Sequence, residues 1–327
     1  MSSITASSIA SSLQAENLYV ANPGLTGDLG ITYALKMMRG RPGAVILLDR
    51  TYKMQGPIIL GTGQALVGLG TSTVLQYAGD PLKPAITVSS GGGLQSLKIT
   101  GPGGAGIGIE LKQLTSGFTI RDVTVQGFKH GAELNNCYTQ IWNACRFEGN
   151  DVGIHFSGQW VMNGYFTEGH IAGNRIGVLI EGAAHLGHEF RTCIEGNTEA
   201  GIWSTGSLGN SEIHRCYFEL NGQGDIILNN GYIMQVEIHS NLFAAAMQPP
   251  ELTSQVGVRV NAGHYVSIHD NNFGITNPLE ILPGAQDVQV GPNLFSVKPL
   301  LSQVVGGFNT RYFEGSETPP ATWFDVP

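Results

Sequence analysis

Three glutamates recur at matching places in a repeated sequence pattern, and each is followed two residues later by a basic residue. The glutamates are Glu189, Glu212 and Glu237, and the basic residues are Arg191, His214 and His239. Residues two apart in a β-strand point to the same side of the sheet. A protonated carboxyl group beside an ionised one is the combination that hydrolyses glycosidic bonds. We therefore take the glutamates as candidate catalytic residues and the basic residues as candidate substrate-binding residues.

The distance between strands decides which carboxyl groups can work together. Neighbouring strands would lie about 4.8 Å apart, and stacked carboxylates repel one another, so one of a pair favours its protonated form. Retaining glycosidases hold their carboxyl groups about 5 to 5.5 Å apart, and inverting enzymes about 6.5 to 9.5 Å. Adjacent strands therefore fit the first geometry, and alternate strands lie just beyond the second.

Two other interpretations of the same residues stay open. The first is a solvated ladder of cross-strand ion pairs, each of which contributes little. The second is elimination, in which a cation neutralises a uronate carboxylate while a basic group or Tyr165 removes the proton at C5. Because the glutamates would repel an acidic sugar, we rank hydrolysis above elimination.

Two aromatic residues, Trp142 and Tyr165, are expected on the same side of the strands as the glutamates. There their flat rings would stack on sugars, although packing in the core or at a subunit contact explains them equally well. Four further histidines are expected to be surface or packing residues. They are His130, His170, His185 and His188.

A short apolar strand that starts with a small residue or a turn residue recurs along the chain. Its apolar positions are Ile107, Ala132, Ile154, Val178, Ile202, Ile226, Val258 and Leu279, at intervals of 25, 22, 24, 24, 24, 32 and 21 residues. A second strand with alternating polarity follows each of these eight positions. Its inward residues are expected to be Ile120, Ile141, Phe166, Phe190, Ile213, Ile238, Ile268 and Val290. The intervals are too short for helical crossovers, so the pattern predicts an all-β solenoid of parallel strands around one core.

Stacked turns place equivalent residues in columns. Asn241, Asn271 and Asn293 are expected to form one inward column in which the side-chain amides bond to one another. We expect Cys193 and Cys216 at the same position of earlier turns and Cys145 one residue away, all as buried structural thiols. The repeat offers no explanation for Cys137.

Both ends of an open stack need covers. A helix is expected from Asp28 to Arg39, with Asp28 as its N-cap and with Gly40 and Pro42 ending it. The interval of 32 residues predicts an insertion at about Ala244 to Gln255. We expect three parts: an N-terminal arm (1–27), a β-helix domain with its cap (28–295), and a tail (296–327) that caps the stack or contacts another subunit.

Composition excludes several classes of protein. The chain has 327 residues with 42% hydrophobic residues, which is too many for a disordered protein. A net charge of −8 argues against nucleic acid as a partner, and no apolar run is long enough for membrane insertion. The first residues show no signal-peptide pattern, and no CxxC pair or known metal spacing is present. We therefore expect no cofactor and no metal.

The N-terminal part resembles the pectate-lyase-like right-handed β-helix superfamily. The resemblance rests on Gly43 to Asp49, Tyr52, Ile58 to Leu60, Ala65 to Gly70 and Val74-Leu75, and with the later turns it spans roughly residues 28 to 295. The chain is most similar to bacteriophage tailspike and capsule-depolymerase domains. None of that family's catalytic motifs matches residue by residue, so the resemblance implies the fold more strongly than the activity.

This resemblance implies a right-handed β-helix that forms a homotrimer on a virion tail or outside the cell. It also implies that the protein binds or cleaves a polysaccharide of a bacterial surface. Hydrolysis by two of the three glutamates is the leading expectation. A polysaccharide lyase or a fructan transferase on the same fold is the first alternative, and an adhesin or structural spike that binds glycan without cleaving it is the second.

Overall fold

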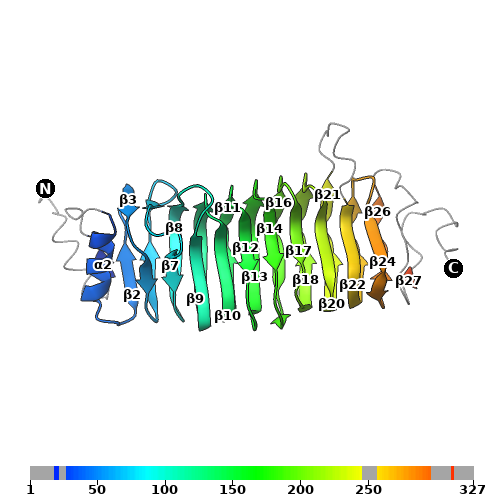
Figure 1. The fold of residues 1–327 in the computed structure, drawn as a ribbon, viewed down its shortest axis with the longest axis horizontal. Helices are drawn as coiled ribbons and strands as arrows, with labels where there is room; N and C mark the ends of the chain where they lie inside the picture. Colours follow the sequence, from blue (N-terminus) through cyan, green and yellow to red (C-terminus); the bar gives the residue numbers. More distant parts are fainter. Residues whose placement is uncertain (1–17, 22–26, 245–255, 296–310, 313–327) are drawn as a thin grey trace, which may run out of the picture.

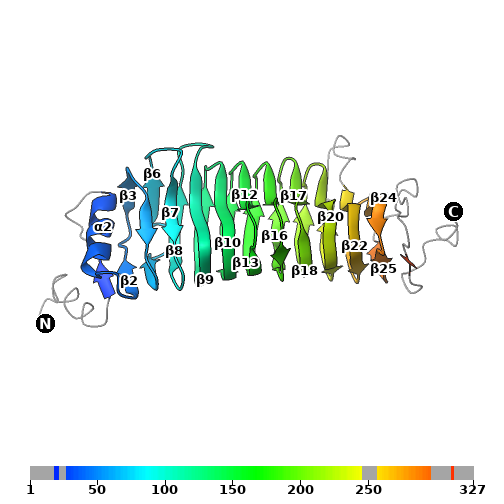
Figure 2. The same ribbon diagram turned by 60° about the horizontal axis from the view of Figure 1, so that its bottom comes forward.

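Parallel strands build an elongated solenoid from one end of the molecule to the other (Figure 1). The computed structural model describes residues 18–21, 27–244, 256–295 and 311–312. Every strand pairing in this part of the chain is parallel, and successive turns of the chain lie side by side in both views (Figures 1 and 2). The predicted all-β parallel solenoid is therefore confirmed.

The strands form three sheets, which we number in the order in which the chain runs through a turn. Sheet 1 contains β4 (Ile58–Leu60), β7 (Pro84–Val88), β12 (Val152–Phe156), β14 (Ile176–Ile180), β17 (Ala200–Ser204) and β24 (Leu279–Gln286). Sheet 2 contains β1 (Leu18–Val20), β2 (Gly43–Ile46), β5 (Gln64–Val67), β15 (His185–Leu186), β18 (Leu208–His214), β25 (Gln289–Val290) and β27 (Arg311–Tyr312). Sheet 3 contains β3 (Thr51–Met54), β6 (Val74–Tyr77), β11 (Arg146–Glu148), β19 (Tyr217–Glu219), β21 (Leu242–Ala244), β23 (Asn272–Phe273) and β26 (Leu294–Phe295).

Longer strands pass from one sheet into the next. β9 (Ile107–Gln126) runs through all three sheets; β10 (His130–Asn143), β20 (Gly224–His239) and β22 (Val256–His269) join sheets 1 and 2; β8 (Gly93–Thr100), β13 (Met162–Ala172) and β16 (Glu189–Glu195) join sheets 2 and 3. At most corners between sheets 2 and 3 a non-glycine residue has a positive φ, as at Ala144 (54°), Arg215 (51°) and Ser240 (57°). The alternation of the sequence breaks there because the strand changes sheet.

Aromatic and aliphatic side chains from all three sheets fill the interior. In sheet 3 the rings of Phe218, Phe243 and Phe273 stack at centroid distances of 5.0 and 4.6 Å, and Phe166 stacks on Phe190 in sheet 2 at 5.0 Å. These ladders repeat the strand spacing of about 4.8 Å. Each turn therefore buries its apolar face on the preceding turn, so the core runs continuously along the solenoid.

The predicted asparagine column is confirmed. Asn241 Nδ2 donates to Asn271 Oδ1 at 2.9 Å, and Asn271 Nδ2 donates to Asn293 Oδ1 at 3.0 Å. A second buried column, which the repeat analysis missed, follows sheet 3 in the chain. It consists of Asn150, Asn174, Asn197 and Asn221, joined by the same amide bonds at 2.8 to 3.1 Å. Both columns satisfy buried polar groups at corners where the backbone leaves a sheet.

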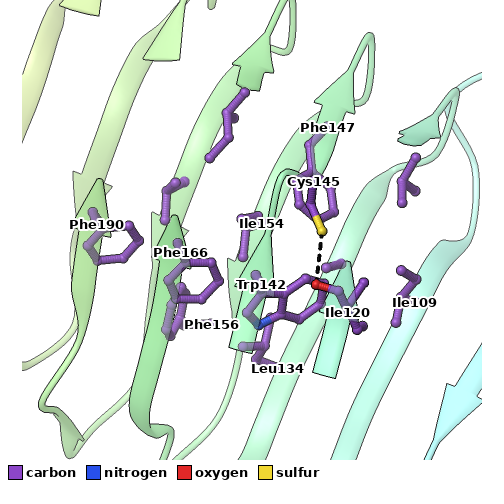
Figure 3. Packing of buried hydrophobic residues seen from close by; sticks show 14 of the residues in the cluster. Ile109, Ile120, Leu134, Trp142, Cys145, Phe147, Ile154, Phe156, Phe166 and Phe190 are labelled. Carbon is purple, nitrogen blue, oxygen red and sulfur yellow. Dashed lines mark hydrogen bonds between the residues drawn. The ribbon is translucent and has the colours of Figure 1, made fainter. Parts of the chain in front are cut away.

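The expected placement of two cysteines is wrong. Cys145 lies in the inward column, where its Sγ donates to Ile120 O (Figure 3), and Cys216 makes the equivalent bond to Phe190 O. Cys193 lies instead on the outer face of sheet 3, paired with Tyr217, and it is half-buried. The corner before Cys193 is one residue shorter than its neighbours, so Thr192 takes the inward position. Cys137 is buried and accepts a bond from Gln140 Nε2 at 3.1 Å.

The N-terminal cover is helix α2 (Asp28–Met37), which lies across the first turn (Figure 1). It buries Ile31 and Ala34 against the first turn, and its N-cap is Gly27 rather than the expected Asp28. The Asp28 carboxylate instead accepts bonds from the backbone N–H groups of Gln55 and Gly56. Among the described residues, no helix is long and apolar enough to span a membrane.

Strands β1 and β27 lie within the expected arm and tail and add to sheet 2 at either end. The rest of the tail after Phe295, and all of the expected insertion except Ala244, fall outside the described residues. The expected division into three parts stays a prediction.

Candidate functional site

The three candidate glutamates form one row on the outer face of sheet 2. Glu189 pairs with Glu212, and Glu212 pairs with Glu237, in direct register on adjacent strands. Tyr165 precedes them in the row and Ser267 follows. Period-2 alternation keeps inner neighbours such as Phe190 and Ile213 in the core while the carboxylates point outward. The expected stacking is therefore confirmed, whereas a catalytic role stays a prediction.

A polar groove of about 410 Å³ lies over the C-terminal part of this row. It is lined by Asn210, Ser211, Glu212, Gln235, Glu237, Tyr265, Val266, Ser267 and Gln289. Two of the three glutamates thus face the groove, and Glu189 lies beside it. No cationic side chain is among the lining residues.

The histidines form a second row along the same face. His214, His239 and His269 are in register, and their rings stack at centroid distances of 5.1 and 5.2 Å. His214 Nε2 lies 3.1 Å from Glu189 Oε1 and 3.9 Å from Glu212 Oε2. His214 therefore connects the glutamate outside the groove to the first glutamate inside it.

Burial, and then the neighbouring rings of His214 and His269, hold the pKa of His239 below its usual value, against the opposing charges of Glu212 and Glu237. His239 is therefore neutral at pH 7, and its ring nitrogens remain available as hydrogen-bond partners. One ligand atom each from Glu212, His214 and His239 lies within 4.8 Å of the others, so these three could also hold a metal ion.

None of the five expected substrate-binding residues is among those that line the groove. His214, His239 and Tyr165 lie beside it on the outer face of sheet 2, and the other two lie elsewhere. Arg191 points toward Glu168 Oε1, 3.5 Å from its Nη2, and does not line the groove. Trp142 is only 1% exposed and packs in the core against the rings of Phe118 and Phe166. Figure 3 shows it in the interior with Phe166. Its predicted outward position is wrong.

The error at Trp142 is a register slip of one residue. Trp142, not Ile141, pairs with Phe166 and Ile120, so Gln140 and Trp142 point inward while Ile141 is 41% exposed. A slip of one residue exchanges the two faces of a strand. The position of Cys145, three residues after Trp142, carried the signal, because Cys216 also stands three residues after the inward Ile213.

Three further residues that line the groove were not among the predicted site residues. Asn210, Gln235 and Tyr265 stand two residues before Glu212, Glu237 and Ser267 respectively, with φ of 46°, 55° and 56°. Extending the alternation by one step toward the N-terminus would have found them. Tyr265 is 58% exposed and presents the flat aromatic surface that had been expected from Trp142.

The site can carry out proton transfer between a carboxyl group and a bound ligand. Glu212 and Glu237 lie on adjacent strands about 4.8 Å apart. Amide and hydroxyl groups of the lining can exchange hydrogen bonds with a polar ligand, and Tyr265 can stack on it. These features suit a neutral polyhydroxyl ligand.

Comparison with solved structures finds the same fold in proteins of different activities. The Dettilon tailspike protein is 12% identical over 92% of this chain and 69% of its own, with a TM-score of 0.62. DFA-IIIase from Arthrobacter chlorophenolicus A6 without its lid is 14% identical over 92% and 99%, with a TM-score of 0.60. The alginate lyase from Paenibacillus sp. str. FPU-7 is 12% identical over 91% and 98%, with a TM-score of 0.56.

No curated protein sequence matches the chain. Because the three structures differ in activity, their shared fold does not choose a chemistry. The family model described as the right handed beta helix region matches residues 105–273, which is more than half of the chain. The protein belongs to this right-handed β-helix family.

Proposed function

We propose that the protein binds and hydrolyses a polysaccharide of a bacterial surface in the groove on sheet 2. The observation that carries the proposal is that Glu212 and Glu237 lie in register on adjacent strands and line one open polar groove. Their strand spacing suits the carboxyl separation of about 5 to 5.5 Å in retaining glycosidases. One glutamate acts as the acid and the other as the nucleophile.

Residues beside the glutamate row orient the sugar. Tyr265 stacks on a ring, and His239, neutral at pH 7, exchanges hydrogen bonds with hydroxyl groups. Glu189 and His214 form a hydrogen-bonded pair beside the groove and do not react themselves. Tyr165, which is 41% exposed next to Glu189, extends the binding face.

Elimination receives less support than hydrolysis. A lyase must neutralise the carboxylate of an acidic sugar, and the lining of the groove contains two carboxylates and no cationic side chain. The nearest expected cation, Arg191, points to Glu168. The electrostatics of the groove therefore favour a neutral glycan and hydrolysis.

The fold similarity to a tailspike protein supports a surface glycan as the target and a location on a virion tail or outside the cell. We also propose a homotrimer, which the resemblance to tailspike domains implies. Light scattering coupled to size-exclusion chromatography tests the stoichiometry, and a mass of one chain would reject the trimer.

The proposed chemistry is tested on a panel of capsular polysaccharides and lipopolysaccharides. We expect new reducing ends without absorbance near 235 nm, and loss of this activity in Glu212→Gln and Glu237→Gln. Glu219→Gln is the matched control, because Glu219 lies on the outer face of sheet 3 and accepts a bond from Tyr217. An unsaturated product would indicate a lyase, and binding without any product would indicate an adhesin; either result rejects hydrolysis.

A further inference from the structure

A second group of histidines and glutamates lies on the outer face of sheet 1. His130 and Glu133 belong to β10, and His155 on β12 pairs directly with Glu133. His130 Nδ1 lies 2.8 Å from Glu133 Oε2 and 3.3 Å from His155 Nδ1. The three side chains are only 13%, 21% and 9% exposed, so they form a fixed and largely covered cluster.

Two outer partners orient these side chains. His155 Nε2 lies 2.7 Å from Glu181 Oε2, and Ser157 Oγ donates to Glu133 Oε1 at 2.8 Å. A carboxylate only accepts, so Nε2 of His155 donates to Glu181 and Nδ1 of His130 donates to Glu133, while Nδ1 of His155 keeps a lone pair directed at His130 Nδ1. A metal ion would replace the proton on His130 Nδ1, and the ring would then carry its proton on Nε2. A carboxylate behind a histidine is the usual outer partner of a metal-bound imidazole.

We propose that His130 Nδ1, His155 Nδ1 and Glu133 Oε2 bind one divalent transition-metal ion of the Zn²⁺ type. In a tetrahedral zinc site with bonds of about 2.0 to 2.1 Å, two ligand atoms lie about 3.3 Å apart, which is the distance between the two Nδ1 atoms. Three protein ligands leave the fourth position to water. The ion would join β10 to β12, outside the groove on sheet 2.

A cluster of similar composition on sheet 3 is less suited to a metal. Both ring nitrogens of His170 already contact carboxylates, Glu148 at 3.3 Å and Glu195 at 2.9 Å. Burial raises the pKa of the nearby Cys193 thiol to about 12, which disfavours the thiolate. His170 is therefore the matched control for His155.

Isothermal titration of the EDTA-treated full chain with ZnCl₂ tests the proposal. We expect one high-affinity ion per chain, at least about 100-fold weaker binding in His155→Ala, and binding about 10- to 100-fold weaker in Glu181→Gln. His170→Ala should bind as wild type does. With Co²⁺ as the probe, wild type should show the visible absorption of a four-coordinate site, and His155→Ala should not.

Glu133→Gln keeps the bond from Ser157 and the size of the side chain, so it tests the ligand without disturbing the fold. Circular dichroism of each metal-free variant confirms that it is folded. The proposal is overturned if wild type does not saturate with one ion, if folded His155→Ala and Glu133→Gln bind Zn²⁺ as tightly as wild type, or if His170→Ala alone loses the ion.

Discussion

The outer faces of sheets 2 and 1 each carry a cluster of glutamate and histidine, and the two clusters differ in how their carboxylates are used. Glu212 in the groove of sheet 2 is 54% exposed, and its contact to His214 is 3.9 Å, beyond hydrogen-bond range. On sheet 1, Glu133 is 21% exposed and both of its oxygens accept short bonds. Similar residues therefore present open carboxylates in one place and a fixed set of ligand atoms in the other.

This difference follows from position in the turn. The groove residues of sheet 2 stand opposite one another in equivalent positions, so like charges face each other and remain solvated. On sheet 1, Glu133 stands in register between Glu110 and His155, and its two oxygens accept bonds from His130 and Ser157. The sheet 2 row therefore leaves open carboxylates for a ligand such as a glycan, whereas the sheet 1 cluster holds its ligand atoms in fixed positions.

Replacing one carboxylate on each sheet should give the largest difference in catalytic rate, because only the carboxylate on sheet 2 is proposed to react. We expect Glu212→Gln to lower kcat by about 10² to 10⁴-fold, because an amide neither donates the proton nor attacks. Glu110→Gln is the control on sheet 1, where Glu110 bonds to Lys112 and Thr87. Reducing-end assays at saturating glycan measure both. Equal activity of the two variants would remove Glu212 from the mechanism.

Acid should weaken the core beneath sheet 2. His188 is buried and bonds to Gly164 N and Val161 O, and burial, together with His185, lowers its pKa to about 3. In the unfolded chain its pKa is about 6.5. Between these two pKa values the unfolded state binds more protons than the folded state. The contribution of His188 to the free energy of unfolding is therefore complete above about pH 6.5 and is lost as the pH falls toward 3.

His188 should make the free energy of unfolding fall by up to about 1.4 kcal/mol for each pH unit. Urea unfolding of wild type and His188→Gln between pH 7.5 and 5 measures it, and the variant should show a smaller dependence on pH. His264→Gln serves as the control, because His264 is half-buried in the middle of β22. A pH dependence identical in wild type and His188→Gln would contradict the assignment.

The fold and the glutamate row could be predicted because both depend on period. Intervals of 24 residues fix which turn lies on which, and alternation fixes which side chains face out, so Glu189, Glu212 and Glu237 fell in register without knowledge of any contact. Errors arose where a corner changed length. The corner before Cys193 has one residue fewer than those around it, and the strand before Cys145 was read one residue out of register.

The cluster on sheet 1 could not be predicted from spacing alone. His130 and Glu133 are near in sequence, but His155 and Glu181 come from the next two turns. Their contact depends on side-chain rotamers as well as on register, and rotamers leave no periodic signal in the sequence. The expectation of no metal rested on the absence of local ligand spacing, which a solenoid does not need because stacking brings distant residues together.

Within sheet 2, two exposed tyrosines test whether the glycan binds in the groove or farther along the glutamate row. Tyr265 lines the groove and Tyr165 does not, although they are 58% and 41% exposed. We expect Tyr265→Ala to raise KM about 5- to 10-fold, the value of one stacking contact, and Tyr165→Ala to raise it less. Initial rates over a range of glycan concentrations measure both. A larger effect at Tyr165 would move the binding site toward the N-terminal turns.

The smallest effect expected is on stability, and it compares one serine from each cluster. Ser157→Ala removes the bond to Glu133 Oε1 and leaves a partly covered carboxylate without that donor, so the free energy of unfolding should fall by about 1 kcal/mol. Ser267→Ala, in the open groove, should change it by less than about 0.5 kcal/mol, because water replaces the hydroxyl. Urea unfolding at pH 7.5 in EDTA measures both. If Ser267→Ala proved the more destabilising, the sheet 2 groove would hold the tighter polar network, and the contrast between an open and a fixed cluster would be reversed.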